Sequence, residues 1–594
     1  MRSWLFSSLF VIFAGAASGQ QASDAVAPEL AGAGQVSGSG AVAAAQARKA
    51  AGAPVEAESW MVVAAHPLAV EAGAEVLAAG GTAADAMVTV QAVLGLVEPQ
   101  SSGLGGGAFL VWWDAETGAL TTLDGRETAP LEATPRLFQD EIGQPLQFYD
   151  AVVGGRSVGT PGTPALLEEA HRRWGTQGWA KLFQPAITLA EEGFDVSPRL
   201  AASIAGDAER LGRFAETAAY FLPGGEPLQQ GQRLRNPDYA QTLRLLAGQG
   251  AESFYTGDVA RDIVQTVRNA PGNPGVLSEA DLALYRVKER PAICADYRGY
   301  DICGMGPPSS GAVAVGQTLG LLRAYDLAAL GPKSAEAWRL IGDASRLAFA
   351  DRGKFLADTD FIPVPLRGLL EETYLENRSQ LLNGEGALGD VQPGAPEFDH
   401  ALNRAMDASI ELPSTSHISI VNSFGNALSM TTTVENAFGA RLMVRGFLLN
   451  NELTDFSFRT HRDGVPIANR VAPGKRPRSS MAPTIVLEDG RPVLVLGSPG
   501  GSRIIPYVSK TLVALLDWEM DAQAAVDLPH LVNRFGTYDL EAGTGAEAQA
   551  AALEALGYEV SLRDLTSGLH VIDLRGGGLR GGADPRREGV ALGQ

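Results

Sequence analysis

The sequence predicts a mixed fold of the α+β class, and two observations carry this prediction. Helical patterns dominate from about residue 164 to 325 and continue at 335–350, whereas the chain becomes rich in strands after Thr415. Hydrophobic residues make up 45% and charged residues 19% of the 594 residues, which is enough apolar material for an extensive core. Length alone suggests several domains, because single cores stop growing near about 250–300 residues.

The first 19 residues have the layout of a secretory signal peptide. Arg2 supplies a positive charge, residues 5–16 are mostly apolar, and residues 17–19 are small enough for a cleavage site. The apolar stretch is short for a membrane span, and no later segment reaches about 18 uninterrupted apolar residues. We therefore expect a secreted or periplasmic protein without a membrane span once the signal, residues 1–19, is removed. An uncleaved membrane anchor is the alternative.

Residues 20–57 consist largely of alanine, glycine, serine and glutamine, with few large apolar side chains. Such a segment buries too little surface to offset the entropy lost by ordering the chain. The sequence therefore predicts a disordered tail over 20–57 and folded chain from residue 58 onward.

The folded part begins with a strand and two helices. Residues 61–65 are apolar and predict a buried strand. Pro67 suits the first turn of a helix that a glycine pair ends. Thr82 and Asp85 then predict a capping box at the start of a second helix, which extends to about Val97.

A glycine run at 103–107 follows. It is a weak match to a dinucleotide-binding fingerprint, but a predicted helix precedes it and a predicted strand follows it, which is the reverse of the required order. We therefore reject nucleotide binding and expect the glycines to let the backbone pass close under a site or to form a tight turn. Residues 109–113 and 120–123 predict a hairpin.

The remaining elements follow from hydrophobic periodicity. The clearest predicted helices in the middle of the chain are 164–174, 179–192, 257–269 and 335–350. Residues 393–407 are polar and aperiodic and predict a surface linker. Beyond them, strands are predicted at 418–421 and 427–434 and helices at 509–516 and 545–556.

The two cysteines flank a predicted hairpin whose turn is Arg298-Gly299. Counting outward from the turn places Cys294 opposite Cys303, in a non-hydrogen-bonded pair whose α-carbons come close enough for a disulfide. We predict this bond for an exported protein in an oxidising compartment. Two buried thiols are the alternative.

The net charge of −21 argues against two classes of partner. Nucleic acids and anionic membrane surfaces both require a basic face on the protein. We therefore expect neither as a partner of the mature chain.

The stretch 413–422 places hydroxyl residues and His417 directly before an alternating apolar strand. Such residues are ordinarily turn formers that bond their own backbone. Here, however, three more polar or glycine-rich clusters follow within about one domain's length. They lie at 450–456, 475–481 and 497–503.

The order and spacing of these clusters resemble the small subunit of γ-glutamyltransferases, which are N-terminal-nucleophile hydrolases. The resemblance extends over about residues 61–587, with further matching motifs at 98–107, 124–127, 307–311 and 584–586. It implies a four-layer αββα sandwich built as one intertwined core, which replaces the expectation of several domains.

The resemblance implies a precursor that cleaves itself between Ser414 and Thr415. A threonine hydroxyl is a poor nucleophile at neutral pH, and the cut gives Thr415 a base of its own, the free α-amino group. The large subunit, 58–414, and the small catalytic subunit, 415–594, would form a heterodimer. Thr415 would then transfer γ-glutamyl groups from a glutathione-like substrate to water, an amino acid or a peptide, without a metal or another cofactor.

The resemblance also assigns roles to residues around Thr415. The backbone N–H groups of Gly500 and Gly501 would form an oxyanion hole, and Thr433 would orient the nucleophile, although threonine is also common in ordinary strands. Two sets of polar side chains would bind the substrate's α-carboxylate and α-ammonium groups. The carboxylate set is Arg126, Ser479 and Ser480, and the ammonium set is Glu452 and Asp455.

Two departures from the family pattern leave alternatives open. Glu435 stands where many members carry an asparagine that contacts the ammonium, and three carboxylates around one cation repel one another unless one is protonated or paired elsewhere. The segment between Asp455 and Ser479 also lacks the tyrosine that closes a lid in some relatives, which favours bulkier substrates. A glutaryl or cephalosporin-type acylase of the same fold is therefore the nearest alternative. A non-catalytic exported binding protein is the alternative from another class.

Overall fold

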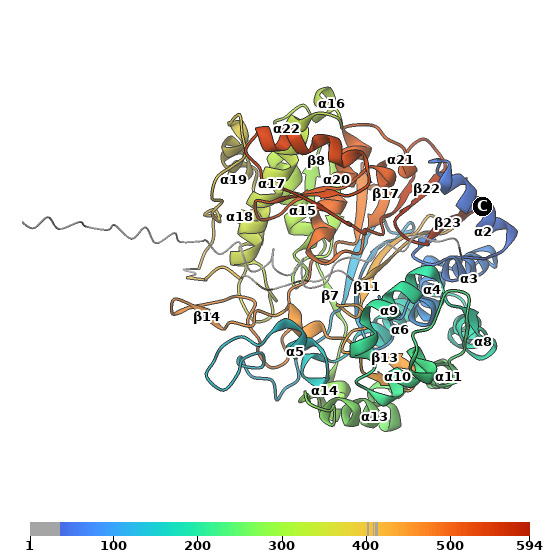
Figure 1. Cartoon of the computed structure of the whole chain (residues 1–594). Helices are drawn as coiled ribbons and strands as arrows, with labels where there is room; N and C mark the ends of the chain where they lie inside the picture. The colour runs from blue at the N-terminus through green and yellow to red at the C-terminus, as the bar shows by residue number, and fades with distance from the viewer. Residues whose placement is uncertain (1–35, 401–402, 408, 410, 412–413) are drawn as a thin grey trace, which may run out of the picture.

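The computed structural model describes residues 36–400, 403–407, 409, 411 and 414–594 (Figure 1). The predicted signal peptide, 1–19, and the first part of the predicted tail, 20–35, lie outside the described residues. Two seven-stranded sheets form the centre of the described chain. In the same part of the chain, no helix is both long and apolar enough to cross a membrane.

The first sheet holds the strand that follows Thr415 in its interior. Every strand in it is antiparallel to its neighbours, and the order is β23 (Val590–Gly593), β2 (Met61–Ala64), β10 (Ser416–Val421), β11 (Ala427–Thr433), β3 (Gly107–Trp113), β4 (Leu120–Gly125) and β7 (Lys288–Arg290). The predicted hairpin of β3 with β4 is therefore present, and it lies beside a second hairpin that the predicted strands β10 and β11 form.

The second sheet is also antiparallel throughout. Its order is β1 (Val55–Ala57), β22 (Leu579–Ala583), β21 (His570–Asp573), β17 (Arg491–Gly497), β16 (Thr484–Glu488), β9 (Tyr300–Gly304) and β8 (Ile293–Tyr297). Each sheet thus combines strands that come before Thr415 with strands that come after it.

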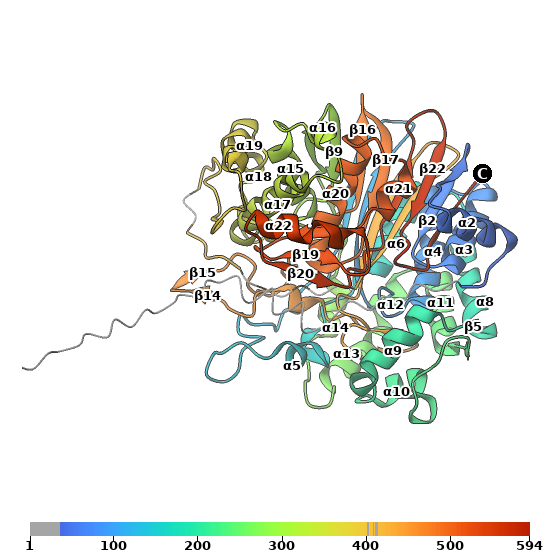
Figure 2. The ribbon, with the colours of Figure 1, turned by 45° about the horizontal axis from the view of Figure 1, so that its top comes forward.

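Successive side chains of each strand point to opposite faces of its sheet, so each strand contributes to two apolar layers. In β10, Ile418 packs among the helices whereas Val421 packs between the sheets. In β17, Val495 packs between the sheets whereas Leu494 and Leu496 pack against helices on the other side. Helices therefore cover the outer face of each sheet while the inner faces meet, and Figure 2 shows β17 between α20 and β2. The predicted four-layer αββα sandwich is confirmed.

Most of the helices belong to one of two apolar clusters, and α18 (Leu366–Leu369) belongs to a smaller third one. Those that share a cluster with the first sheet are α2 (Gly40–Ala50), α3 (Pro67–Ala78), α4 (Ala83–Val97), α5 (Phe148–Val152), α6 (Thr163–Trp174), α7 (Trp179–Leu182), α8 (Gln184–Glu192), α9 (Pro198–Leu211), α10 (Ala215–Phe221), α11 (Pro237–Gln249), α12 (Glu252–Tyr255), α13 (Gly257–Arg268) and α14 (Glu279–Leu284). Those on the second sheet's side are α15 (Gly311–Leu322), α16 (Leu327–Leu330), α17 (Ala335–Phe355), α19 (Glu372–Ser379), α20 (Ile504–Leu516), α21 (Ala522–Asp527) and α22 (Ala550–Ala555).

Local sequence rules set the start of two helices. The predicted capping box begins α4, where the Thr82 backbone N–H donates to Asp85 Oδ2 (2.9 Å) and the Asp85 N–H donates to Thr82 Oγ1 (3.2 Å). The single helix predicted at 179–192 is divided into α7 and α8. Pro185 lies in the first turn of α8, and a proline lacks the N–H that would have continued α7.

The predicted cysteine hairpin is formed by β8 and β9. Its register pairs Cys294 with Cys303, and a disulfide joins the two sulfur atoms. Arg298 and Gly299 both have positive φ angles, 57° and 84°, as a tight two-residue hairpin turn requires. The disulfide ties β8, the last strand in this sheet order, to its neighbour β9.

The predicted disordered tail is wrong from residue 36 to 57. Residues 40–50 form α2, and residues 55–57 pair with β22 as β1. Val42 is fully buried, and the Lys49 ammonium donates to two backbone carbonyls near the C-terminus (2.6 and 2.8 Å). Because alanine has the highest helix propensity, a few such contacts are enough to hold this segment. The folded chain therefore begins before the predicted boundary at residue 58.

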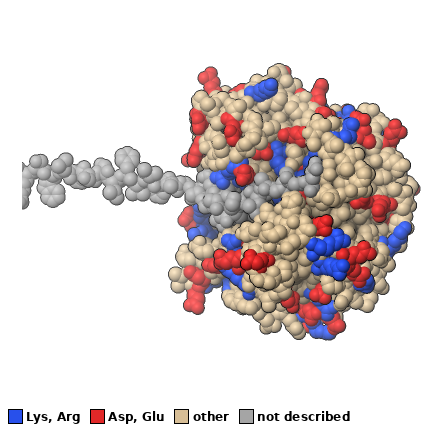
Figure 3. Space-filling view, turned by 45° about the vertical axis from the view of Figure 1, so that its right-hand side comes forward, with Lys and Arg blue, Asp and Glu red and all other residues tan. Residues whose placement is uncertain are grey.

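Acidic and basic side chains are interspersed on the face of the molecule seen in Figure 3. This face therefore lacks the large basic area that binding to a phosphate backbone requires.

Candidate active site

Thr415 lies where two central strands of the first sheet end. It directly precedes β10, and Ser416 pairs with Thr432 near the end of β11, so Thr415 and Thr433 face each other across the sheet. Thr415 is buried, with 4% of its surface exposed. The Arg587 guanidinium, one residue beyond the last matching motif at 584–586, donates to the Thr415 carbonyl oxygen (2.8 Å).

Two hydroxyl groups converge on the carbonyl of the Ser414–Thr415 peptide bond. Thr433 Oγ1 donates to the Ser414 carbonyl oxygen (2.9 Å), and the Thr415 hydroxyl contacts the same oxygen. The two threonine oxygens are 3.3 Å apart. The backbone N–H of Glu435 donates to Thr433 Oγ1 (2.8 Å), which leaves the proton of Thr433 for the carbonyl. This arrangement polarises the bond and places a nucleophile beside it.

The segment at 98–101 holds both residues that flank Thr415. Ser414 Oγ donates to the Gln100 carbonyl oxygen (2.7 Å), and Ser416 Oγ donates to Glu98 Oε2 (3.0 Å). The upstream motif found in the sequence therefore positions the bond, although its residues lie more than 300 positions away.

The two glycines predicted to form an oxyanion hole lie between β17 and α20. Both have positive φ angles, 135° for Gly500 and 56° for Gly501, which favour glycine. Gly501 lines the same cavity as Thr415. A β-carbon on Gly500 would come within 2.8 Å of the Tyr507 ring, so the loop also has no room for a side chain at that position.

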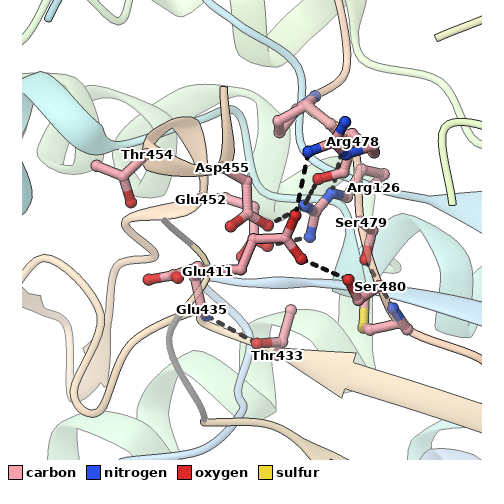
Figure 4. Close-up of polar contacts among 12 residues, drawn as sticks. Arg126, Glu411, Thr433, Glu435, Glu452, Thr454, Asp455, Arg478, Ser479 and Ser480 are labelled. Carbon is pink, nitrogen blue, oxygen red and sulfur yellow. Dashed lines mark hydrogen bonds and ion pairs between the residues drawn. The ribbon is translucent and has the colours of Figure 1, made fainter. Parts of the chain in front are cut away.

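Arg126 forms ion pairs with both residues of the predicted ammonium set. Its Nη1 contacts Glu452 and its Nη2 contacts Asp455, and all three side chains are buried (Figure 4). The guanidinium also donates to the carbonyl oxygens of Pro477 (3.2 Å) and Arg478 (3.1 Å). The structure therefore brings the predicted residues together, but the charge of Arg126 is already balanced by two carboxylates.

The pKa values of these carboxylates are set by burial and by their mutual repulsion. Burial raises the pKa of Asp455 well above its usual range, and the charges of Glu435, Glu411 and Glu452 add to this against the opposing effect of Arg126. Burial likewise raises the pKa of Glu452. Protons are therefore bound more tightly here than at exposed carboxylates.

The side chain of Glu435 is hydrogen-bonded to Asn451. The Asn451 side-chain amide donates to its carboxylate, and the same amide nitrogen donates to Thr454 Oγ1 (2.9 Å). Glu435 has a φ angle of 79°, which is uncommon for a residue with a side chain and costs local strain. Its carboxylate lines the same cavity as Thr415.

The serine pair 479–480 joins the two halves of the chain. The Ser310 hydroxyl donates to the Ser479 carbonyl oxygen (2.6 Å), and the Met481 N–H donates to Ser479 Oγ (3.1 Å). Ser480 Oγ accepts from Arg352 Nη2 (2.7 Å) and donates to the Glu411 carboxylate.

Glu411 and Arg352 were not found by sequence reasoning. The predicted surface linker at 393–407 ends in a buried segment, where Asp407 pairs with Arg478 (2.9 Å) and Glu411 pairs with Arg352. One signal was available for Arg352, because helical periodicity places it on the same face of α17 as Phe349, which is buried. For Glu411 the local sequence carries no such signal.

His417 is buried among polar partners. Its Nδ1 lies 2.9 Å from Thr431 Oγ1 and its Nε2 lies 3.1 Å from Ser419 Oγ. Burial and the neighbouring His570 lower the pKa of His417 well below its usual range, so the ring is neutral and structural. Within the described residues, no cluster of histidine, cysteine, aspartate and glutamate could hold a metal ion.

The predicted side chains line one cavity with very little free space. Its lining residues are Arg126, Glu411, Thr415, Thr433, Glu435, Glu452, Asp455, Ser479, Ser480, Met481, Gly501 and Ile504. The space open to water within it is about 20 Å³. That volume suits about one water molecule, whose share of such space is about 10–15 Å³, and it is too small for an amino-acid side chain.

Known proteins resemble this chain over most of its length. The family model described as gamma-glutamyltranspeptidase matches residues 69–594. The glutathione hydrolase proenzyme of Bacillus subtilis (strain 168) is 38% identical over 546 residues, which cover 90% of this chain and 91% of the relative. The acylase ACY 1 proenzyme of Pseudomonas sp. (strain SE83) is 37% identical over 514 residues, with 85% and 88% covered. The crystal structure of cephalosporin acylase from Bacillus halodurans matches with a TM-score of 0.80 at 27% identity, over 91% of this chain and 97% of that one.

Proposed function

The chain belongs to the gamma-glutamyltranspeptidase family, and from this premise we propose that it cuts itself between Ser414 and Thr415 and then transfers γ-glutamyl groups. The donors would be glutathione-like compounds, and the acceptors would be water, amino acids or peptides. One observation carries the proposal: the hydroxyl groups of Thr415 and Thr433 both meet the carbonyl oxygen of the bond to be cut.

The cut proceeds in two steps. The oxygen of the Thr415 side chain attacks the Ser414 carbonyl carbon, the peptide C–N bond breaks, and the released nitrogen takes up the hydroxyl proton. Water then hydrolyses the resulting ester, which leaves a carboxylate on Ser414 and a free amine and hydroxyl on Thr415. The large chain, which ends at Ser414, and the small chain, 415–594, stay together as a heterodimer because both contribute strands to both sheets.

The transfer step uses the new amine as a base. An α-amino group has an unperturbed pKa of about 7.7–8.0, which suits proton transfer near neutral pH. The Thr415 hydroxyl gives its proton to this amine and attacks the γ-carbonyl of the donor, while the N–H groups of Gly500 and Gly501 stabilise the developing negative charge. The leaving amine takes the proton, and water or an amino acid later releases the acyl group from Thr415.

The substrate's charged end would lie among the carboxylates and Arg126. Glu452 and Asp455 are the proposed partners of the α-ammonium, and Ser479 and Ser480 flank the proposed carboxylate site. Export to the periplasm or the medium is part of the proposal, and two features support it. They are the signal-like layout of residues 1–19 and the disulfide between Cys294 and Cys303.

An acylase acting on glutaryl-type amides is the second candidate. Glu435 favours it, because three carboxylates around one α-ammonium site repel one another, which weakens that site for a γ-glutamyl group. The similarity to an acylase and to a cephalosporin acylase also supports this candidate. The two functions differ in whether the substrate needs an α-ammonium group.

The test compares two anilides that differ only in that group. We expect the purified protein to release the aniline from γ-glutamyl anilide at least about tenfold faster than from glutaryl anilide, since one charge-assisted contact contributes about 1.5–3 kcal/mol. The Thr415→Ala variant should release it from neither. A preference for the glutaryl compound would select the acylase, and no turnover of either compound by a cleaved protein would contradict both.

A further inference from the structure

Glu411 is a buried carboxylate held by two arginines and a serine. Arg352 Nη2 forms an ion pair with one carboxylate oxygen, and Ser480 Oγ donates to the other. Arg478 Nη2 lies 3.5 Å from the first oxygen. Figure 4 shows this carboxylate in front of Arg126, between Arg478 and Ser480. Although burial opposes ionisation, the two arginines hold the pKa of Glu411 at about 2, so it is charged.

Glu411 narrows the cavity beside Thr415. It lines the cavity of Thr415, in which only about 20 Å³ remains open to water. A γ-glutamyl group therefore cannot enter this cavity while Glu411 is present, because the remaining space suits about one water molecule. Glu411 also lies four positions before Thr415, on the other side of the bond that is cut.

The three arginines near this cavity, Arg126, Arg352 and Arg478, differ in which carboxylates balance their charges. Arg126 is paired with Glu452 and Asp455, which belong to the small chain and stay in place after the cut. Arg352 forms its ion pair with Glu411, which becomes part of a new chain end. Arg478 keeps a second partner, Asp407, at 2.9 Å. If Glu411 moves away after cleavage, Arg352 loses its carboxylate partner. A buried guanidinium without a carboxylate partner favours the binding of another anion.

We propose that Glu411 holds, in the uncut chain, the place of the substrate's α-carboxylate, and that Arg352 and Ser480 receive that carboxylate after cleavage. The proposal rests on the proposed γ-glutamyl transfer and deepens it by assigning the group that recognises the carboxylate. Arg352 is then a specificity-determining residue, in addition to the serines and Arg126 of the family pattern.

The charge balance of the cavity agrees with an exchange of one carboxylate for another. The charge of Glu411 adds to the effect of burial in raising the pKa values of Asp455 and Glu452. When Glu411 leaves, these two carboxylates ionise more readily and can attract an ammonium group. A substrate's α-amino-acid end brings both charges, since its carboxylate replaces Glu411 and its ammonium meets Asp455 and Glu452.

The first test pairs an enzyme variant with a substrate change. The substrate 4-aminobutyryl anilide is γ-glutamyl anilide without its α-carboxylate. For the cleaved Arg352→Gln enzyme we expect kcat/KM for γ-glutamyl anilide to fall by about tenfold to 100-fold, the value of one charge-assisted contact, and kcat/KM for 4-aminobutyryl anilide to change less than about threefold. Arg339→Gln is the matched control, because Arg339 is equally buried on α17 but pairs with Glu336 away from the cavity.

The second test needs no turnover and no change at Arg352. The uncut Thr415→Ala protein should show no binding of L-glutamate in equilibrium dialysis, whereas the Thr415→Ala, Glu411→Ala double variant should bind it with an affinity at least about tenfold above the detection limit. The control adds Glu397→Ala instead, an exposed acid in the same segment, and should leave binding absent.

The outcomes separate the inference from the proposed function. If wild-type enzyme cleaves γ-glutamyl anilide but Arg352→Gln affects both anilides equally, or neither, the assignment of Arg352 is overturned and γ-glutamyl transfer stands. Equal binding of L-glutamate with and without Glu411 would overturn the assignment of Glu411. A cleaved wild-type enzyme that is inert toward γ-glutamyl anilide would overturn the proposed function and the inference together.

Discussion

At the scale of single residues, the Thr433 hydroxyl donates to the carbonyl of the bond before Thr415, and in the proposed mechanism it activates that bond. We expect Thr433→Ala to slow self-cleavage by about 100-fold or more, the effect of removing one fixed donor to a developing oxyanion. Thr433→Ser should retain most of the rate, because it keeps the hydroxyl that donates to the Ser414 carbonyl. The rate is measured as the loss of full-length chain with time on denaturing gels.

A neighbouring threonine supplies the control for this prediction. Thr432 is also buried on β11, and in the described part of the chain its hydroxyl has no hydrogen-bond partner. Thr432→Ala should therefore cleave at the wild-type rate. Unchanged cleavage in Thr433→Ala, or equal slowing in both alanine variants, would contradict the role given to Thr433.

Glu588 links stability to pH. Burial and the nearby Glu98 raise the pKa of Glu588 to about 7. A carboxyl group whose pKa is raised on folding binds its proton more tightly in the folded state. Its contribution to stability is complete below the unfolded pKa of about 4.3 and is lost as the pH rises through 7.

Glu588→Gln should remove that part of the pH dependence. Between pH 5 and 8 we expect the melting temperature of the variant to fall less than that of the wild type. The difference corresponds to a loss of up to about a few kcal/mol in the wild type's free energy of unfolding. Glu554→Gln, at an exposed position on α22, is the control and should follow the wild type. Parallel melting curves of Glu588→Gln and wild type across this range would show that the carboxyl group is not the cause.

The sequence identified most of the charged groups at the site but not their pairing. Thr415, Arg126 and Asp455 could be predicted because each stands in a motif with a characteristic order. The ion pair between Arg126 and Glu452 joins residues 326 positions apart, and no local pattern encodes such a contact. Glu411 was missed for the same reason, since its partner Arg352 lies 59 positions away on another element.

At the scale of elements, the disulfide of the β8–β9 hairpin stabilises the edge of the second sheet. We expect the Cys294→Ser, Cys303→Ser double variant to be less stable by about 2–3 kcal/mol, the usual effect of a bond that closes a short loop. Activity should remain, because the hairpin lies outside the cavity of Thr415.

A reductant provides the matched comparison for the disulfide. Treatment of wild-type protein should lower the melting temperature toward that of the double variant and should leave the variant unchanged. The bond is absent if the reductant changes neither the melting temperature of the wild-type protein nor its free thiol content, which is measured under denaturing conditions.

Elements with strong local signals were predictable, and elements that depend on docking were not. The capping box of Thr82 and Asp85 fixes the start of α4 within the local sequence. Helix α2 was missed because its own residues bury little surface. Its Lys49 contacts a segment 538 positions later, which supplies the surface on which the helix packs.

At the scale of the whole molecule, one core is built from both halves of the chain. The first sheet takes β2, β3, β4 and β7 from residues before Thr415, and β10, β11 and β23 from residues after it. The sequence predicted this arrangement only through its resemblance to a family, because strand order across a sheet leaves no trace in composition or periodicity. Length alone favours separate domains, which this shared core contradicts.

The shared core also determines what cleavage can change. The proposed cut at Ser414–Thr415 would break the chain next to β10 but would leave every strand of the two sheets paired with its neighbours. We therefore expect the cut protein to elute from a native size-exclusion column as one species that contains both chains. Separation of the chains without denaturant would contradict the intertwined core.

The measurement that tests the central claim most directly is the intact mass and N-terminal sequence of purified wild-type and Thr415→Ala protein. We expect the wild type to contain two chains, of which the smaller begins at Thr415 and spans residues 415–594, and the variant to remain a single uncut chain. A wild-type protein that stays in one piece, or a variant that is cut at the same bond, would contradict the assignment of Thr415 as the nucleophile.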